Sequence, residues 1–205
     1  MSETAILPLA LTVMLGPQIL VGMLLIMRKD AIKSSLIYIL SIVSTLMLTT
    51  FLYYKLIENT DLHNVSMGGR PFLKYVLILF FIILIIRSVI NRNKITKPPK
   101  WMKGISSASL SEIFFIGFFL IAFMPTDVIV AFSVGNILNG ESGNFWDALP
   151  FFGAVLLVSL FPLTIYFSLG RSKRAKYLEN VNNWLNTHGY LINVVVMVFF
   201  IILML

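Results

Sequence analysis

The residues of this 205-residue chain that could carry chemistry surround two prolines in otherwise apolar runs. The first group reads Gly16-Pro17-Gln18, and the second reads Pro125-Thr126-Asp127. A proline removes one helical hydrogen bond and clashes with the preceding turn, so a helix bends or breaks there. Backbone groups freed at such a break can hold a substrate or an ion inside a membrane protein. These six residues are therefore the candidate substrate- or ion-binding site.

Of these six residues, Asp127 is the one with an ionisable side chain. A carboxylate near the centre of a bilayer costs about 2.5–3.5 kcal/mol on insertion scales and usually serves a function. Because burial disfavours the charged form, the expected roles are proton coupling or binding of a cationic group. The alternative is that Asp127 lies nearer the outer interface and caps a half-helix that begins at Pro125, since aspartate is a favoured cap. The two interpretations are compatible, and both stay open.

Two hydroxyl residues and a third proline are secondary candidates for lining a cavity. Ser41 and Thr45 lie in the second apolar run at a spacing that places them on roughly one helical face. Hydroxyls in membrane helices usually bond their own backbone or a neighbouring helix, so packing is the first interpretation. Pro162, in the fifth run, is expected to produce a plain kink unless it borders the cavity.

Enzyme and metal chemistry is disfavoured by what the sequence lacks. The chain has no cysteine, and its two histidines, His63 and His188, fall between apolar runs. No HExxH, GxSxG or P-loop pattern is present, and no pair of carboxylates shares a segment of the core. Asp127 alone offers too few ligands for a metal. We therefore expect no catalytic residue, no metal site, no cofactor and no enzymatic activity.

Six apolar runs can position the candidate residues inside a membrane. Of the residues, 58% are hydrophobic and 12% are charged, whereas a soluble domain has about a quarter charged. The mean hydropathy is +0.90. The runs are continuous rather than alternating, and a helix satisfies its own backbone in lipid. We predict an all-α membrane protein with transmembrane helices near residues 6–27, 35–57, 72–90, 111–134, 149–169 and 190–205.

The distribution of basic residues predicts the orientation. Of the 16 Lys and Arg residues, 13 lie at the links after the first, third and fifth runs. The positive-inside rule places these links in the cytoplasm. The protein is therefore expected to be a multi-pass protein of the cell (plasma) membrane with both termini extracytoplasmic. The net charge of +7 does not indicate nucleic acid, because the basic residues sit between apolar runs and no nucleic-acid motif is present.

The order of the runs indicates an internal duplication. Residues 1–94 form the predicted first three-helix repeat, residues 95–110 a basic cytoplasmic connector, and residues 111–205 the second repeat. Because three is odd, the second repeat enters the membrane in the opposite sense, as in many secondary transporters. Pro17 and Pro125 each lie in the first helix of their repeat, so both breaks are expected to border one site.

Three stretches of the sequence carry a resemblance to a known family. They read LPLALTVMLGPQILVGMLLIM, PKWMKGISSASLSEIFFIGFFLIAFMPTDVIVAF and FPLTIYFSLGRSKRAKYLENVNNWLNTHG. The chain resembles the GAP/Sap (glycopeptidolipid- or sulfolipid-addressing) proteins of the lysine exporter (LysE) superfamily. Those proteins usually carry Ser-Pro in place of Gly16-Pro17 and Asn-Pro-Lys-Asn in place of Met124-Pro125-Thr126-Asp127. The resemblance implies a LysE-like arrangement and export of a lipid-linked, amphipathic or small-metabolite substrate.

Three functions from different classes follow from these patterns. The leading one is a secondary exporter coupled to protons through Asp127, with membrane lipid and a small-molecule or lipid-linked substrate as its partners. The alternative is a non-transporting accessory protein that helps a lipid-export machine to assemble. An intramembrane enzyme acting on a lipid is the least favoured. The sequence leaves open whether the protein is a homo-oligomer.

Overall fold

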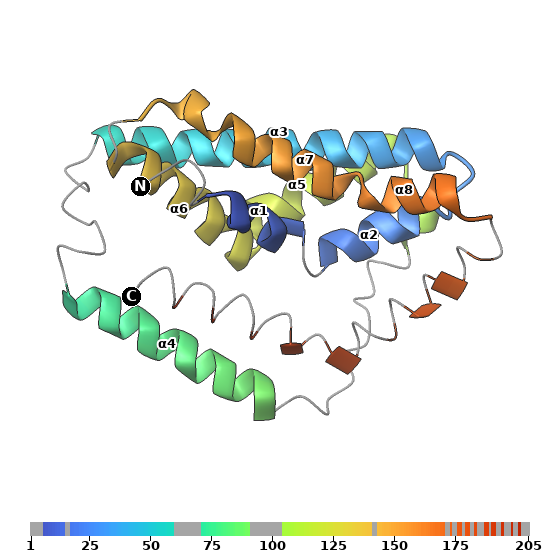
Figure 1. Cartoon of the computed structure of the whole chain (residues 1–205). Coiled ribbons are helices and arrows are strands. Elements are labelled where there is room, and N and C mark those ends of the chain that lie inside the picture. Colours follow the sequence, from blue (N-terminus) through green and yellow to red (C-terminus); the bar gives the residue numbers. More distant parts are fainter. Residues whose placement is uncertain are drawn as a thin grey trace.

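A computed structural model of the chain describes residues 6–14, 17–59, 71–90, 104–140 and 143–170, together with scattered residues between 173 and 201. In these parts of the chain every regular element is helical (Figure 1). The first predicted repeat contains α1 (Leu7–Met14), α2 (Pro17–Leu25), α3 (Ala31–Asn59) and α4 (Pro71–Ile90). The second contains α5 (Leu110–Phe123), α6 (Pro125–Gly140), the short helix η4 (Phe145–Ala148), α7 (Leu149–Ser159) and α8 (Phe161–Ser168).

Two of the apolar runs are broken at their prolines. The axes of α1 and α2 differ by 63°, and those of α5 and α6 by 66°. Pro17 and Pro125 are the first residues of α2 and α6, a position where the missing N–H costs nothing. Met124, directly before Pro125, is extended, with φ −73° and ψ 125°, because a following proline disfavours the helical conformation. A third break, at Leu160, separates α7 from α8, and Pro162 is the second residue of α8.

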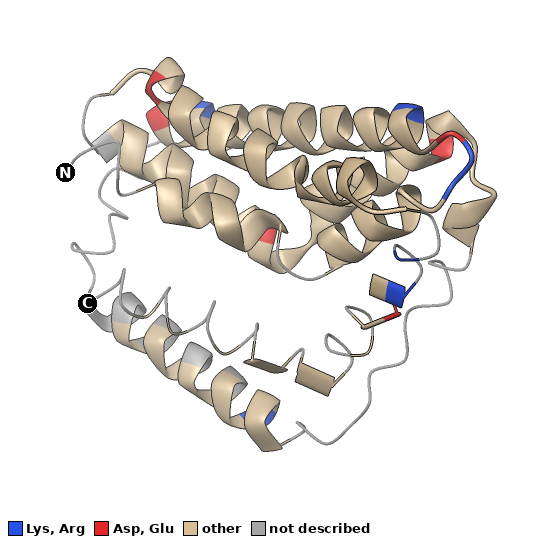
Figure 2. Cartoon of the chain, turned by 45° about the vertical axis from the view of Figure 1, so that its right-hand side comes forward, with Lys and Arg blue, Asp and Glu red and all other residues tan. Residues whose placement is uncertain are grey.

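The length and apolar character of the helices identify a membrane protein. Two helical stretches, Ala31–Asn59 and Phe145–Ser168, are long and apolar enough to cross a bilayer. The count rises to four spans if each bent pair is one span. The described residues therefore contain two to four of the six predicted spans, and most of the last predicted run lies outside them. Charged residues gather mainly near helix ends and in links (Figure 2), which leaves apolar flanks for lipid.

The helices of the two predicted repeats pack against one another. Helix α3 lies along both α5 and α6, while α7 lies along α1 and α8 contacts α2. Small residues permit close approach at two of these contacts. A Cβ atom on Gly117 would lie 2.8 Å from the Ser41 Oγ, and one on Gly135 would lie 2.9 Å from the backbone nitrogen of Tyr54. The ribbon of helix α4 lies to one side of these helices (Figures 1 and 2), and its Ile78 packs against their hydrophobic core.

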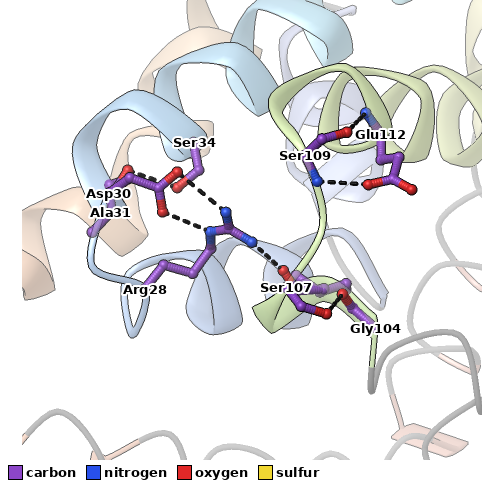
Figure 3. A network of polar contacts seen from close by, with 9 residues as sticks. Arg28, Asp30, Ala31, Ser34, Gly104, Ser107, Ser109 and Glu112 are labelled. Atoms are coloured by element: carbon purple, nitrogen blue, oxygen red, sulfur yellow. Dashed lines mark hydrogen bonds and ion pairs between the residues drawn. The ribbon is translucent and has the colours of Figure 1, made fainter.

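A polar network ties the link after α2 to the segment that leads into α5. The guanidinium of Arg28, in the link after α2, donates to both carboxylate oxygens of Asp30 at 2.8 and 3.1 Å. Its remaining nitrogen donates to the backbone carbonyl of Ile105 at 2.5 Å. Nearby, Ser109 and Glu112 form a capping box that starts α5 (Figure 3), a pairing that satisfies the free N–H groups of a helix start.

Candidate functional site

One hydrogen bond joins the two proline breaks. Gln18 is the second residue of α2, and Asp127 is the third residue of α6. The Gln18 Nε2 donates to the Asp127 Oδ2 at 2.5 Å, across 109 positions of sequence. Both side chains are completely buried. The two groups that the sequence singles out, one in each predicted repeat, therefore meet inside the bundle.

Two further residues hold Gln18 in place. The Gln18 Nε2 also approaches the sulfur of Met124, the residue at the second break, at 3.2 Å. The Tyr38 hydroxyl, on α3, donates to the backbone carbonyl of Gln18 at 3.0 Å. Tyr38 is itself buried. The amide nitrogen of Gln18 is thus directed at the second break, and its backbone is fixed by a third helix.

Two oxygen atoms at this contact have no partner among the described residues. They are the Gln18 Oε1 and the Asp127 Oδ1. Buried polar atoms are nearly always hydrogen-bonded, and an unsatisfied one costs about 1–3 kcal/mol. Both atoms are acceptors when Asp127 is ionised. The arrangement can therefore accept a proton, a cation or a hydrogen-bond donor from a substrate.

Opposing electrostatic effects act on the Asp127 carboxyl. Its place in the first turn of α6 favours the charged form, because the start of a helix carries partial positive charge. Burial among apolar side chains favours the neutral form. Among the described residues Asp127 makes no salt bridge, and the two helices of the other break, α1 and α2, contain no ionisable side chain. The charge of this carboxyl therefore depends on which of the two effects prevails.

The other primary candidates contribute to the breaks in different ways. Pro17 and Pro125 begin the second helix of each bent pair, so they set the direction in which Gln18 and Asp127 point. Thr126 is only partly buried beside Asp127. Gly16 lies outside the described residues. The aspartate lies in the first turn of a half-helix, and its side chain reaches the other break.

The secondary candidates make contacts between helices. The Ser41 hydroxyl donates to the backbone carbonyl of Phe114 on α5 at 2.5 Å, which is the packing role expected first for such hydroxyls. Thr45 is buried one turn further along α3. Pro162 packs against α2, since a Cβ atom on Gly22 would lie 2.8 Å from the Pro162 Cγ.

Tyr38 is the site residue that sequence reasoning missed. A signal was present: Tyr38 lies three residues before Ser41, on the same face of its helix. A buried tyrosine hydroxyl usually finds a hydrogen-bond partner, so an aromatic hydroxyl on the polar face of a membrane helix could have been added to the candidates.

The chain matches the model of a protein family. A family model described as "SfLAP: Sap, sulfolipid-1-addressing protein" matches residues 6–205. The matched region begins just before α1 and includes both breaks and the Gln18–Asp127 contact. No curated protein and no solved structure matches the chain.

Proposed function

We propose that this chain, which belongs to the Sap, sulfolipid-1-addressing protein family, is a secondary exporter in the cell membrane. Membership of this family links the chain to lipid export. Its cargo is a lipid-linked, amphipathic or small-metabolite molecule, and its transport is coupled to protons through Asp127. The observation that carries this proposal is the buried hydrogen bond between Gln18 and Asp127 at the two helix breaks. Broken helices with polar residues at the break are the usual binding elements of secondary transporters.

The packing of the helices supports the inverted, LysE-like arrangement that the proposal includes. The unbroken helix α3 of the first repeat lies along the broken pair α5 and α6 of the second. Reciprocally, α7 and α8 of the second repeat lie against the broken pair α1 and α2 of the first. Such an exchange is expected when two repeats face each other across a pseudo-two-fold axis, with the site at their interface. In this proposal six spans complete the bundle.

Asp127 supplies the coupling in this scheme. The carboxyl takes up a proton where the site opens to one side of the membrane and releases it where the site opens to the other. Gln18 stands beside it as a donor, since its Nε2 contacts the Oδ2. The unsatisfied oxygens accept the proton or a polar group of the cargo. No other carboxyl lies on α1, α2 or α6, so coupling depends on this residue.

A reconstitution experiment tests the proposal. The purified protein is placed in liposomes that contain a radiolabelled sulfolipid, a pH gradient is imposed, and transfer of the lipid between leaflets is measured. We expect Asp127→Asn to abolish transfer. The matched control is Asp147→Asn, at the η4 capping box away from the breaks, which should keep wild-type transfer. Transfer by Asp127→Asn at the wild-type rate would refute coupling through this residue.

A second candidate that fits the family description equally well is an accessory protein of a lipid-export machine. The two candidates differ in what the purified protein does alone. An accessory protein would co-purify with a stoichiometric partner and show no transfer in liposomes that contain it by itself. Transfer of the lipid in those liposomes would support the exporter over the accessory protein.

A further inference from the structure

The two unsatisfied oxygens at the breaks, one on each side chain, could share a single proton. The Gln18 amide and the Asp127 carboxyl are planar groups already joined through the Nε2 and the Oδ2. What each group has left is one oxygen, the Oε1 of Gln18 and the Oδ1 of Asp127. A proton on the Oδ1 would turn that atom into a donor. It could then bond the Oε1, and both buried atoms would be satisfied at once.

We propose that this proton locks the two breaks together: protonated Asp127 and Gln18 form a cyclic pair of two hydrogen bonds, and deprotonation opens it. The inference rests on the proposed function and states how proton coupling would act on the helices. In the locked state the amide donates from Nε2 to Oδ2 and the carboxyl donates from Oδ1 to Oε1. When the proton leaves to water, two acceptors without donors remain in an apolar interior, which is unfavourable.

Few ionisable groups on the elements around α6 could neutralise the Asp127 carboxylate in place of the proton. Helix α6 packs against α1, α3, α5 and η4, and α1 has no ionisable side chain. The ionisable groups of the other three elements are Lys33, Tyr38, Tyr53, Tyr54, Lys55, Glu58, Glu112 and Asp147. Tyr38 has an electrostatic interaction with Asp127, and its hydroxyl donates to the Gln18 backbone.

The remaining ionisable groups are engaged elsewhere or lie near the ends of their helices. Lys55 pairs with Glu58 at 2.5 Å, and Glu112 accepts from the Ser109 backbone at 2.6 Å. Asp147 accepts from the Asn144 backbone at 2.7 Å. Lys33 is exposed near the start of α3. The charge of the site therefore follows the protonation of Asp127.

The position of the Gln18–Asp127 pair explains how the lock would act on the helices. Gln18 stands at the start of α2 and Asp127 at the start of α6, so the cyclic pair connects two half-helices of opposite repeats. Opening it frees the two half-helices to separate, while Tyr38 keeps Gln18 attached to α3. Proton release would then coincide with opening of the site, which is what coupled transport requires.

Thermal unfolding of the full-length protein in detergent, followed from mildly acidic to alkaline pH, tests the lock. We expect the wild-type Tm to fall by several degrees as pH rises, because the closing proton is lost. Asp127→Asn should remove this dependence and keep a high Tm throughout. Its amide offers a permanent N–H to the Gln18 Oε1 and a carbonyl oxygen to the Nε2, and so imitates the protonated acid. Asp147→Asn is the matched control and should follow the wild type.

Infrared spectroscopy gives a second, independent measurement. The wild type should show the C=O band of a protonated carboxyl that disappears at alkaline pH and is missing in Asp127→Asn. A wild-type Tm that parallels that of Asp127→Asn at every pH, or spectra without the band, would overturn the lock. Failure of the proposed function looks different: the band and the pH dependence would persist while Asp127→Asn transports normally.

Discussion

The hydroxyl of Tyr38 donates a hydrogen bond of 3.0 Å to the backbone carbonyl of Gln18, so the long helix α3 holds the first proline break from the side. Both residues are buried. The bond connects an uninterrupted helix to the residue that contacts Asp127. It makes α3 a support for the site, in addition to its packing against α5 and α6.

The first prediction concerns this support. Tyr38→Phe should lower the free energy of unfolding by about 1 kcal/mol, the usual contribution of one hydrogen bond, which shifts the Tm by roughly 2–4 °C in a chain of this size. It should also change the pH at which the Tm falls, since Gln18 loses its anchor beside Asp127. Thermal unfolding at several pH values measures both effects.

Tyr54→Phe is the matched control for this variant. The Tyr54 hydroxyl donates to the backbone carbonyl of Gly143 at 3.2 Å, near the far end of α3 from the site. Its loss should reduce the Tm by a similar amount and leave the pH dependence unchanged. If the two variants have the same pH profile, Tyr38 has only a structural role.

The second prediction concerns the close contact of α3 with α5. A Cβ atom at position 117 would lie 2.8 Å from the Ser41 Oγ, 3.0 Å from the Ser41 Cβ and 3.2 Å from the Tyr38 ring. Gly117→Ala should therefore push the helices apart and cost about 1–3 kcal/mol, as overpacking does. Thermal unfolding in detergent measures the loss.

Gly153→Ala provides the control, because nothing lies within 4 Å of a Cβ atom at that position of α7. There the substitution should be neutral or stabilising by about 0.5–1 kcal/mol, since alanine is the better helix former. Equal stabilities of the two variants would mean that α3 and α5 are not in close contact at Gly117.

Part of this arrangement could be predicted from the sequence and part could not. The breaks at Pro17 and Pro125 follow from local chemistry, since a proline without an N–H cannot continue a helix undisturbed. The apolar runs that become α3 and α7–α8 follow from their composition. The contact of Gln18 with Asp127 does not, because it spans 109 positions and depends on how the two breaks are packed. Tyr38 was missed for the same reason: its partner is a backbone atom of another helix.

The third prediction concerns the link that follows α2. Hydrogen bonding to the Arg28 guanidinium lowers the pKa of the Asp30 carboxyl below its usual value. The ionised form is thus favoured by folding, and its stabilising effect is present above the ordinary pKa of about 3.8 and lost as pH falls through the lowered value. Arg28→Ala should weaken the wild-type loss of stability in this acid range and release the Ile105 carbonyl from its hydrogen bond.

Lys29→Ala serves as the control for Arg28→Ala, because it removes the same charge from the neighbouring, exposed residue. It should keep the acid profile of the wild type, because Lys29 does not appear among the groups that act on Asp30. Acid titration of the unfolding temperature distinguishes the two variants. Identical profiles for Arg28→Ala and the wild type would show that the Arg28–Asp30 pair does not contribute in solution.

The fourth prediction concerns the orientation of the protein in the membrane. Helix α3 has 29 residues, which at about 1.5 Å per residue is enough to cross a bilayer. The basic link at its start is expected in the cytoplasm and the acidic residues at its end outside. The chain contains no cysteine, so single-cysteine variants can be labelled without background. Lys29→Cys and Glu58→Cys, both at exposed positions, report the two ends of this one helix.

In intact cells an impermeant maleimide should label Glu58→Cys, and it should label Lys29→Cys only after permeabilisation. The reverse pattern would invert the orientation, and labelling of both positions in intact cells would mean that α3 does not cross the membrane.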